Sequence, residues 1–386
     1  MLTFPVKGKS NHNINVLFSV FYCFINYFQN YIKISLLTLC FASFCLLIVN
    51  SPIKPNRFGN QNKVVIAINY HHKKKCEKQA AATAHYKLSS ESHSRVKEQF
   101  QKRKNRIEYL CKTLDNDTIN STMKTALSKI VIDQIHGLTW CPVYKSASTM
   151  WMKNFAVLSG YPVTISLHSG HDKNLDFSYI VKQKFQRSDS VEQKLKQISN
   201  TTKFIIVRHP FERLLSAYRD KLEHMKGREY YYRRYGQYIT HRYRAKYSNL
   251  THCEPSFTEF LQFIAKEKRF DEHWVPFIDS CQPCSINYDY IFKFESLSEE
   301  YNYFIKERNL WYYLNYSSNE RKSTSFQGIT DDAVAEKYFE QVPAALLLRI
   351  FDIYQLDFRL FSYSPAKYYF MTKDANQERY NFLLKK

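Results

Sequence analysis

The chain has 386 residues, 44% of them hydrophobic, so it can bury a core in one large domain with appendages or in two domains. Lysine and arginine number 56 against 35 aspartate and glutamate residues, a formal net charge of +21. A surface of this sign favours a polyanionic partner, namely nucleic acid, an anionic membrane or an acidic glycan, and the charge alone does not choose among these.

The N-terminal region contains a candidate membrane segment. Residues 34–49 form an uncharged run of apolar and small side chains, which is just long enough to span a bilayer. Because no small-residue cleavage site follows, we expect an uncleaved transmembrane signal anchor over residues 34–50, with residues 1–33 as a cytoplasmic tail. A second apolar stretch at residues 16–28 leaves a helical hairpin open, and the flanking lysines and arginines do not settle the orientation.

The remainder of the chain carries signs of a lumenal compartment. N-x-[ST] sequons occur only downstream of the apolar run, at Asn116, Asn120, Asn200, Asn249 and Asn315. Each sequon is a weak signal alone, but their one-sided location favours a lumenal, glycosylated C-terminal region. Nucleic acid is then a poor candidate for the polyanionic partner.

Cysteine usage fits an oxidising lumen. Six cysteines lie downstream of the apolar run: Cys76, Cys111, Cys141, Cys253, Cys281 and Cys284. They permit up to three disulfides, whose pairing the sequence does not rank. The CQPC unit at residues 281–284 could instead be half of a zinc site, but no second C-x-x-C accompanies it.

The composition changes again after the apolar run. Residues 51–105 are polar and basic without a sustained apolar period, which is typical of a stem, although a short helix over residues 91–110 is an alternative. From residue 106 to 366, short apolar segments at 131–135, 139–143 and 204–207 alternate with helical patterns. We therefore expect an α/β domain with a central, mostly parallel sheet, followed by a C-terminal tail at residues 367–386.

The segment TWCPVYKSASTMWMKNF, residues 139–155, suits phosphate binding. A short apolar stretch leads into a loop and then a helical pattern, and the loop contains Lys145, Ser146, Ser148 and Thr149. Small residues let the backbone close around a phosphate, while hydroxyls and an ammonium supply donors and charge. The Walker A pattern is absent, which disfavours a P-loop kinase or NTPase.

A second segment, FIIVRHPFERLLSAYRDKLE at residues 204–223, has the same character. It predicts a buried strand, then Arg208, then a helix beginning at Pro210. A helix N-terminus attracts anions, and Arg208 with Ser216 would hold a phosphate. The alternative is an ordinary α/β crossover with a surface arginine.

Together the two segments resemble the 5′-phosphosulfate and 3′-phosphate loops of Golgi carbohydrate sulfotransferases, above all the chondroitin/dermatan 4-O-sulfotransferase family. The family loops read roughly PK-x-[GA]-[CS]-[ST]-N-W and R-[DEH]-PFERL-x-SA-[FY]-R-[DN]-K. The second loop is matched at Arg208, Pro210, Phe211, Glu212, Arg213, Leu214, Ser216, Ala217, Tyr218, Arg219 and Lys221. The first is matched at Lys145, Ala147, Ser148, Thr149 and Trp151, but Tyr144 replaces the usual proline and Met150 the usual asparagine. Segments 271–295 and 354–365 also fit, so the resemblance extends from about residue 139 to 365.

The resemblance implies a P-loop-like, three-layer fold and 3′-phosphoadenylyl sulfate (PAPS) as the donor. Lys145 would contact the 5′-phosphate and the bridging oxygen, and the adjoining loop residues Ser146, Ala147, Ser148, Thr149 and Met150 would hold the remaining 5′ oxygens. Arg208 and Ser216 would bind the 3′-phosphate within a loop that includes Pro210, Phe211, Glu212 and Arg213. We expect Glu212 and Arg213 to pair with each other, and the scheme requires no metal.

A base must take the proton of the acceptor hydroxyl, and histidine suits neutral pH. His273 lies in a segment that matches the family and is the first candidate. His168 and His171, between the two loops, are the competitors. His273 could instead be a buried structural histidine, and His209 is interpreted as a tolerated replacement of the family's acid.

Lysines and arginines interleave with tyrosines in REYYYRRYGQYITHRYRAKY, residues 228–247, which could bind uronate or sulfate groups and stack on sugar rings. The alternative is an amphipathic helix with a solvated basic face. The sequence thus predicts a Golgi, single-pass type II enzyme that sulfates a glycan, with the 4-hydroxyl of GalNAc in chondroitin or dermatan as the expected position. A catalytically inactive lumenal lectin for anionic glycans is the alternative, and oligomeric state is not predicted.

Overall fold

The computed structural model describes residues 90–114, 123–161, 176–186, 189–246, 252–314 and 330–376. The expected anchor at 34–50, His168, His171 and all sequons except Asn200 lie outside these residues. Among the described helices, none combines the length and apolar character needed to cross a membrane. Residues 90–246 and 254–386 form one compact unit, to which the description below refers.

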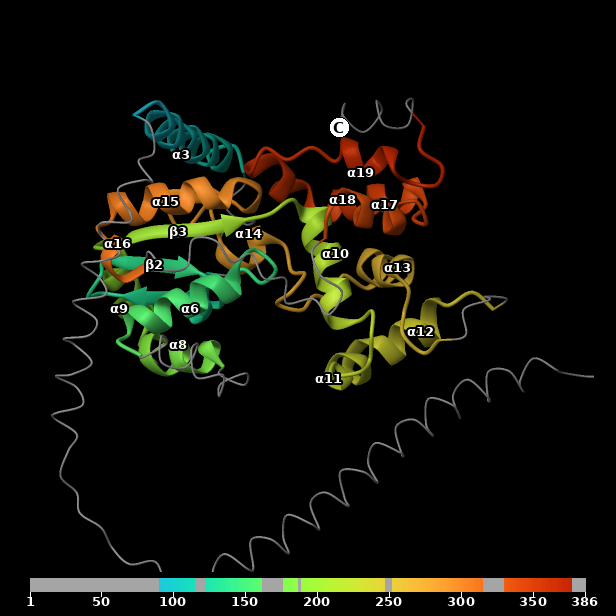
Figure 1. The fold of residues 1–386 in the computed structure, drawn as a ribbon. Coiled ribbons are helices and arrows are strands. Elements are labelled where there is room, and N and C mark those ends of the chain that lie inside the picture. The colour runs from blue at the N-terminus through green and yellow to red at the C-terminus, as the bar shows by residue number, and fades with distance from the viewer. Residues whose placement is uncertain are drawn as a thin grey trace, which may run out of the picture. The chain divides into compact units, whose positions relative to one another are not determined.

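The centre of the unit is a four-stranded sheet in the order β1-β2-β3-β4 (Figure 1). Strands β2, β3 and β4 are parallel, and the edge strand β1 is antiparallel to β2. The bounds of the strands are β1 Val131–Asp133, β2 Leu138–Cys141, β3 Thr202–Val207 and β4 Tyr290–Lys293. The predicted central, mostly parallel sheet is therefore confirmed.

Alternate side chains of the sheet enter two different cores. On β3, Phe204 and Ile206 pack with one hydrophobic cluster, whereas Ile205 and Val207 pack with another, as the two-residue period of a strand requires. The first cluster draws on α6, α8, α15 and α16, and the second on α5, α9, α14 and the end of α18. These helices are α5 Met123–Lys129, α6 Ser148–Leu158, α8 Phe177–Phe185, α9 Val191–Ser199, α14 Phe277–Cys281, α15 Leu297–Glu307, α16 Trp311–Leu314 and α18 Ala344–Leu360. Helices thus cover both faces, which makes three layers.

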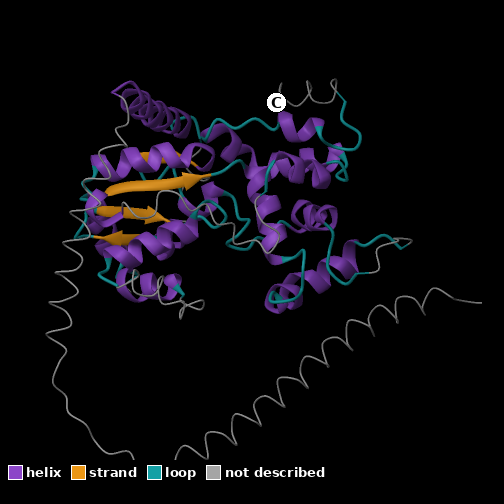
Figure 2. Ribbon diagram, in the orientation of Figure 1, coloured by secondary structure: helices purple, strands orange, loops and turns teal. Residues whose placement is uncertain are grey.

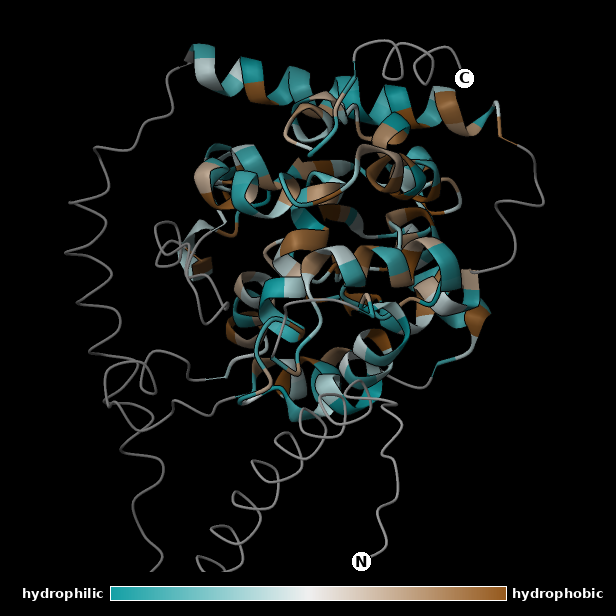
Figure 3. Ribbon diagram, turned by 90° about the vertical axis from the view of Figure 1, so that its right-hand side faces the viewer, coloured by the Kyte–Doolittle hydropathy of each residue, from teal (hydrophilic) through white to brown (hydrophobic). Residues whose placement is uncertain are grey.

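A helical subdomain follows the carboxyl end of β3 and has its own core (Figure 2). Its main members are α10 Pro210–Lys221, α13 Phe257–Glu267, α17 Asp332–Phe339, α18 and α19 Ala366–Phe370. Four short helical elements remain. Three follow α10, namely α11 Glu229–Tyr231, the π-helix η2 Tyr232–Gly236 and α12 Gln237–Tyr243, and the 3-10 turn η3 Phe294–Ser296 follows β4. Hydrophilic and hydrophobic residues alternate along its helices, as expected where one face of each helix is buried (Figure 3).

The folded unit extends beyond both predicted boundaries. Helix α3, Ser90–Cys111, buries Val96 and Phe100 against the sheet, and Arg103 donates a hydrogen bond to the carbonyl of Ile291 on β4. The stem predicted to run to residue 105 therefore includes a packed helix, as the alternative interpretation had it. At the other end, Tyr368 and Tyr369 of α19 are buried in the helical core, so the expected tail at 367–386 begins within the fold.

Two disulfides cross-link the unit, Cys111–Cys284 and Cys141–Cys281. The CQPC unit therefore supplies one cysteine to each of two disulfides, and the zinc interpretation of this unit is wrong. The second disulfide joins the end of β2, directly before the Lys145 loop, to the end of α14. Each bridge closes a long loop, which limits the unfolded chain and so stabilises the fold.

Candidate active site

The two predicted phosphate loops meet at the carboxyl ends of the adjacent parallel strands β2 and β3. Arg208, which follows β3, donates from Nη1 to the carbonyl oxygen of Lys145 at 3.2 Å. The carboxyl ends of parallel strands meet at one edge of the sheet, which is where open α/β folds bind ligands. Residues that are about sixty positions apart in the sequence are thereby brought into direct contact.

The first loop has the features of an anion cradle. Lys145 and Ala147 have left-handed backbones, with φ of 68° and 58°, a strained conformation for residues other than glycine. Ala147 occupies the N-cap of α6 and offers no side-chain acceptor, so the first N–H groups of this 11-residue helix have no side-chain cap. Ser146 is 1% exposed, and its Oγ is buried without a hydrogen-bond partner. A buried unpaired hydroxyl beside an uncapped helix N-terminus fits a bound phosphate oxygen. Of the other predicted contacts, Ser148 is buried, Met150 is partly buried and Thr149 is exposed.

The second loop holds Arg208 in a buried position. Arg208 is 5% exposed, its guanidinium carbon lies 4.5 Å from the centre of the Phe294 ring, and its Nε is 3.4 Å from Glu212 Oε2. Pro210 opens α10 as predicted, and His209 caps the helix by accepting from the N–H of Phe211 at 3.3 Å. Ser216 lies farther along the same helix and is partly buried.

The expected ion pair between Glu212 and Arg213 is wrong. Glu212 faces Arg208 and accepts a hydrogen bond from Tyr368. Arg213 is fully buried and donates to three backbone carbonyls instead, those of Tyr144 at 3.0 Å, Val275 at 2.7 Å and Glu272 at 3.4 Å. The side chain of Arg213 therefore fixes the first loop against segment 272–275.

His273 lies against the first loop. Its ring is 4.7 Å from that of Tyr144, centre to centre, so one of the two residues that depart from the family pattern contacts the candidate base. His273 Nδ1 lies 2.6 Å from Asp271 Oδ1, and 3.4 Å from the hydroxyl of Tyr231. An Nδ1 engaged by a carboxylate presents Nε2 as the proton acceptor. Burial lowers the pKa of His273, against the raising effect of Asp271, which favours the neutral imidazole that a base requires.

A cluster of charges connects Lys145 with His273. Lys145 Nζ lies 2.9 Å from Asp220 Oδ2, and Lys221 and Arg228 contact the same carboxylate at 3.2 Å and 2.8 Å. The ammonium of Lys221 also lies 4.8 Å from the centre of the Tyr231 ring, which reaches His273. Burial would raise the pKa of Asp220, but Lys145 and Lys221 lower it well below its usual range. Burial lowers the pKa of Lys145, which Asp220 opposes.

Sequence reasoning missed Asp220, Asp271 and Tyr231. Asp220 sits in the R-D-K end of the second loop, between the matched residues Arg219 and Lys221, and this place was a signal. Asp271, two residues before His273, was a similar signal, because a carboxylate that close can reach the ring. Tyr231 gave no signal that separates it from its tyrosine neighbours.

The basic tyrosine-rich segment is not one regular helix. It divides into α11, η2 and α12, and a π-helical turn of this kind is often found at functional sites. Arg244 is committed to the fold, since it contacts Glu259 at 3.0 and 3.1 Å and the carbonyl of Glu254. Arg233 and Arg242 are exposed, and Arg234 lies over the rings of Tyr230 and Tyr235 at 5.7 and 5.3 Å.

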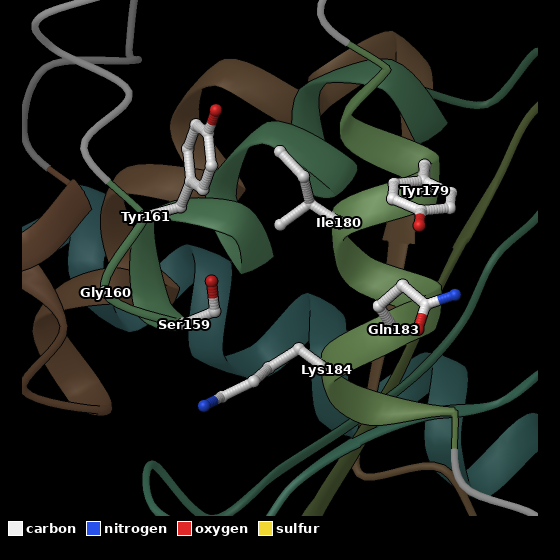
Figure 4. Close-up of a pocket in the computed structure, with 7 residues that line it drawn as sticks. All are labelled: Ser159, Gly160, Tyr161, Tyr179, Ile180, Gln183 and Lys184. Carbon is white, nitrogen blue, oxygen red and sulfur yellow. The ribbon is translucent and has the colours of Figure 1, made fainter.

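A separate hollow of about 440 Å³ lies between the C-terminal end of α6 and α8, lined by Tyr161, Tyr179 and Lys184 among others (Figure 4). The Lys145 loop is at the opposite end of α6, about 16 Å away along an 11-residue helix. The hollow is therefore distinct from the site built by the two loops.

Among the described residues, no three His, Cys, Asp or Glu side chains are grouped so that they could hold a metal ion.

The chain matches the model of the sulfotransferase family over residues 128–364. It is 31% identical to carbohydrate sulfotransferase 11 of Rattus norvegicus over 256 residues, which cover 63% of this chain and 69% of the relative. It is 31% identical to carbohydrate sulfotransferase 14 of Danio rerio over 246 residues, 62% of this chain and 63% of the relative. With human carbohydrate sulfotransferase 8 it shares 32% identity over 252 residues, 62% of this chain and 56% of the relative.

No solved structure matches the chain significantly. The family match nevertheless covers more than half of the chain and includes both phosphate loops, Asp220 and His273. These three relatives carry the name carbohydrate sulfotransferase. The chain belongs to the sulfotransferase family, whose enzymes take PAPS as the sulfuryl donor.

Proposed function

We propose that this enzyme transfers a sulfuryl group from PAPS to a glycan hydroxyl, the 4-hydroxyl of GalNAc in chondroitin or dermatan. Relatives named carbohydrate sulfotransferases support a glycan acceptor. One observation carries the mechanism: the Lys145 loop, which suits the donor, is in contact with His273, which suits a base, through Tyr144. The GalNAc position follows from the resemblance to the 4-O-sulfotransferase loops.

The donor's charges have complementary groups on the two loops. The unpaired Ser146 hydroxyl, the N–H groups at the start of α6 and the Lys145 ammonium suit the 5′-phosphate end. Arg208 and Ser216 suit the 3′-phosphate. When bound, PAPS supplies the SO₃ group: its bond from sulfur to the 5′-phosphate oxygen breaks, and the electron pair stays on adenosine 3′,5′-bisphosphate.

The remaining tasks fall to side chains of the chain itself. His273 Nε2 takes the proton of the acceptor hydroxyl while that oxygen forms its bond to sulfur, and Asp271 orients the ring through Nδ1. Lys145 faces the charge that develops on the bridging oxygen. Arg213 holds the two segments in register, because it bonds the carbonyls of Tyr144 and Val275 together.

The acceptor lies, in this proposal, along the segment of α11, η2 and α12. Tyr231 of this segment reaches His273, so a glycan bound there would approach the base. The exposed ring of Tyr230 and the exposed guanidinium groups of Arg233 and Arg242 suit a sugar face and acidic groups. Together with the excess of positive charge, this favours an anionic acceptor.

For location, we propose a type II Golgi membrane enzyme with its catalytic unit in the lumen. The apolar run at 34–49 supports the anchor, and two disulfides in the folded unit support an oxidising compartment.

The test uses the full-length chain with ³⁵S-labelled PAPS and a panel of desulfated chondroitin, dermatan, heparan and short GalNAc-terminated glycans. We expect label on chondroitin or dermatan, at the 4-position on disaccharide analysis, and a loss of about 10²–10³-fold in kcat with Lys145→Ala. Label only on heparan or on neutral glycans would overturn the acceptor assignment. Donor binding without transfer to any glycan would favour the inactive lectin.

A further inference from the structure

One carboxylate at the end of α10 is shared by three cationic side chains. Asp220 accepts Lys145 Nζ at 2.9 Å and Lys221 Nζ at 3.2 Å on Oδ2, and Arg228 Nη2 at 2.8 Å on Oδ1. Arg228 further donates from Nε to the backbone carbonyl of Asp220 at 2.6 Å. The side chains of Asp220 and Lys145 are only 5% and 7% exposed. Three cations thus share this one carboxylate, so one of them could turn to an anionic ligand without leaving the carboxylate unpaired.

The position of Lys145 identifies that anion. Its backbone carbonyl is held by Arg208 in the second loop, and its left-handed backbone belongs to the cradle that ends at α6. The same side chain that suits the donor's 5′-phosphosulfate is therefore bound to an internal carboxylate. A carboxylate and a phosphate or sulfate oxygen compete for one ammonium, because each accepts the same charge-assisted hydrogen bonds.

Because two other cations contact Asp220, Lys145 can leave this carboxylate at a low cost in free energy. If Lys145 left Asp220 without replacement, a buried carboxylate would be stranded, which is strongly unfavourable. Lys221 and Arg228 remain on Asp220 after Lys145 leaves, so its charge stays compensated. In the opposite direction, the return of Lys145 to Asp220 withdraws a contact from the product and favours its release.

We propose that Asp220 is a positioning residue that holds Lys145 in the donor-free enzyme and exchanges it with the phosphosulfate of the donor. This inference rests on the proposed role of Lys145 at the donor. Asp220 touches neither substrate in this scheme and acts through Lys145 alone. Lys221 and Arg228 keep the carboxylate in place during the exchange.

The primary measurement is the binding of adenosine 3′,5′-bisphosphate by calorimetry to the full-length chain, which does not depend on turnover. For Asp220→Asn we expect binding about tenfold tighter, because the competing anion is removed. PAPS should show a lower KM and a lower kcat, since the product leaves more slowly. In a Lys145→Ala background, Asp220→Asn should change the affinity less than about twofold.

The matched control is Asp289→Asn. Asp289 is also shared by two lysines, Lys104 at 3.2 Å and Lys203 at 3.4 Å, but it lies before β4, at the end of the sheet away from the loops. This variant should leave the affinity within about twofold, whereas an equal gain would attribute the effect to net charge and overturn the exchange. Weaker binding by Asp220→Asn, with an intact melting transition, would also overturn it. If that variant fails to fold, Lys221→Met serves instead. Asp220 then keeps only Arg228 when Lys145 leaves, so the exchange should be less favourable and the bisphosphate should bind more weakly, whereas tighter binding would overturn the exchange.

The two proposals fail separately. If Lys145→Ala binds the bisphosphate as tightly as the unaltered enzyme, the proposed donor role of Lys145 fails. If Lys145→Ala weakens binding but Asp220→Asn gives an equal gain with and without Lys145, only the exchange fails.

Discussion

The donor side and the acceptor side of the site handle charge in opposite ways. On the donor side Arg208, Arg213 and Asp220 are buried, and each is bonded to another part of the chain. On the acceptor side Arg233 and Arg242 are exposed on a segment with a π-helical turn. The donor is a constant molecule with fixed charges, for which a rigid, preorganised site is the best solution. In the proposed function the acceptor is a glycan, and exposed side chains would permit it to enter and leave.

His273 lies where the two sides meet, and its substitution should have the largest effect. We expect His273→Gln to lower kcat by about 10²–10⁴-fold, the range for a lost general base, while the binding of adenosine 3′,5′-bisphosphate stays unchanged. Because burial lowers the pKa of His273, the activity of the unaltered enzyme should decline only below the ordinary range of histidine. The measurement is kcat/KM against pH.

Asp271→Asn sharpens this prediction. The carboxylate raises the pKa of His273, so its loss should move the acidic limb of the profile to lower pH and reduce the rate less than His273→Gln does. If His273→Gln keeps most of the activity, His273 is structural, and His168 and His171 become the candidates for the base.

The donor side also contains a buried histidine, His209, which should make the stability of the fold depend on pH. His209 accepts from the N–H of Phe211, lies 3.0 Å from the carbonyl of Ser364 through Nε2 and is 8% exposed among aromatic rings. Burial lowers its pKa from 6.5 to about 4. A histidine whose pKa is lowered on folding stabilises the fold above pH 6.5, and this contribution is lost as the pH falls towards 4. The full difference corresponds to about 3 kcal/mol.

His209→Asn tests the effect, because asparagine is a good N-cap and does not titrate. The free energy of unfolding of this variant should depend less on pH between 6.5 and 4 than that of the unaltered chain, as measured by denaturant titration at several pH values. Parallel pH dependences of the two proteins would contradict a buried neutral His209.

The sequence predicts the elements that carry the donor site, but not the contacts between them. The strands before Lys145 and Arg208, the helix beginning at Pro210 and the central sheet all follow from local patterns, and the structure confirms these elements. The partners of Arg213 could not be predicted, because they are backbone carbonyls brought close by the tertiary fold. The contacts of Asp220 with Lys145 and Arg228 depend likewise on how the first loop and the chain after α10 fold against it, which no local pattern determines.

Substitutions on the acceptor side should have the smallest effect on activity, and this effect should depend on the salt concentration. The double variant Arg233→Gln/Arg242→Gln removes exposed charges from the proposed glycan surface, since Arg244 is needed for its contacts with Glu259. We expect the KM for desulfated chondroitin to rise about tenfold at low salt, and its dependence on salt to become weaker, because screening then has fewer charges to act on. The KM for PAPS should not change.

The control for that surface is Arg349→Gln/Arg359→Gln, which removes the same charge from exposed positions of α18. If recognition depends on the position of the arginines in the segment of α11, η2 and α12, the control should retain the KM and the salt dependence of the unaltered enzyme. Equal losses in both variants would mean that the glycan responds to the net charge of the surface alone. The acceptor would then have to be positioned by groups nearer the base, such as Tyr144, whose ring already contacts His273.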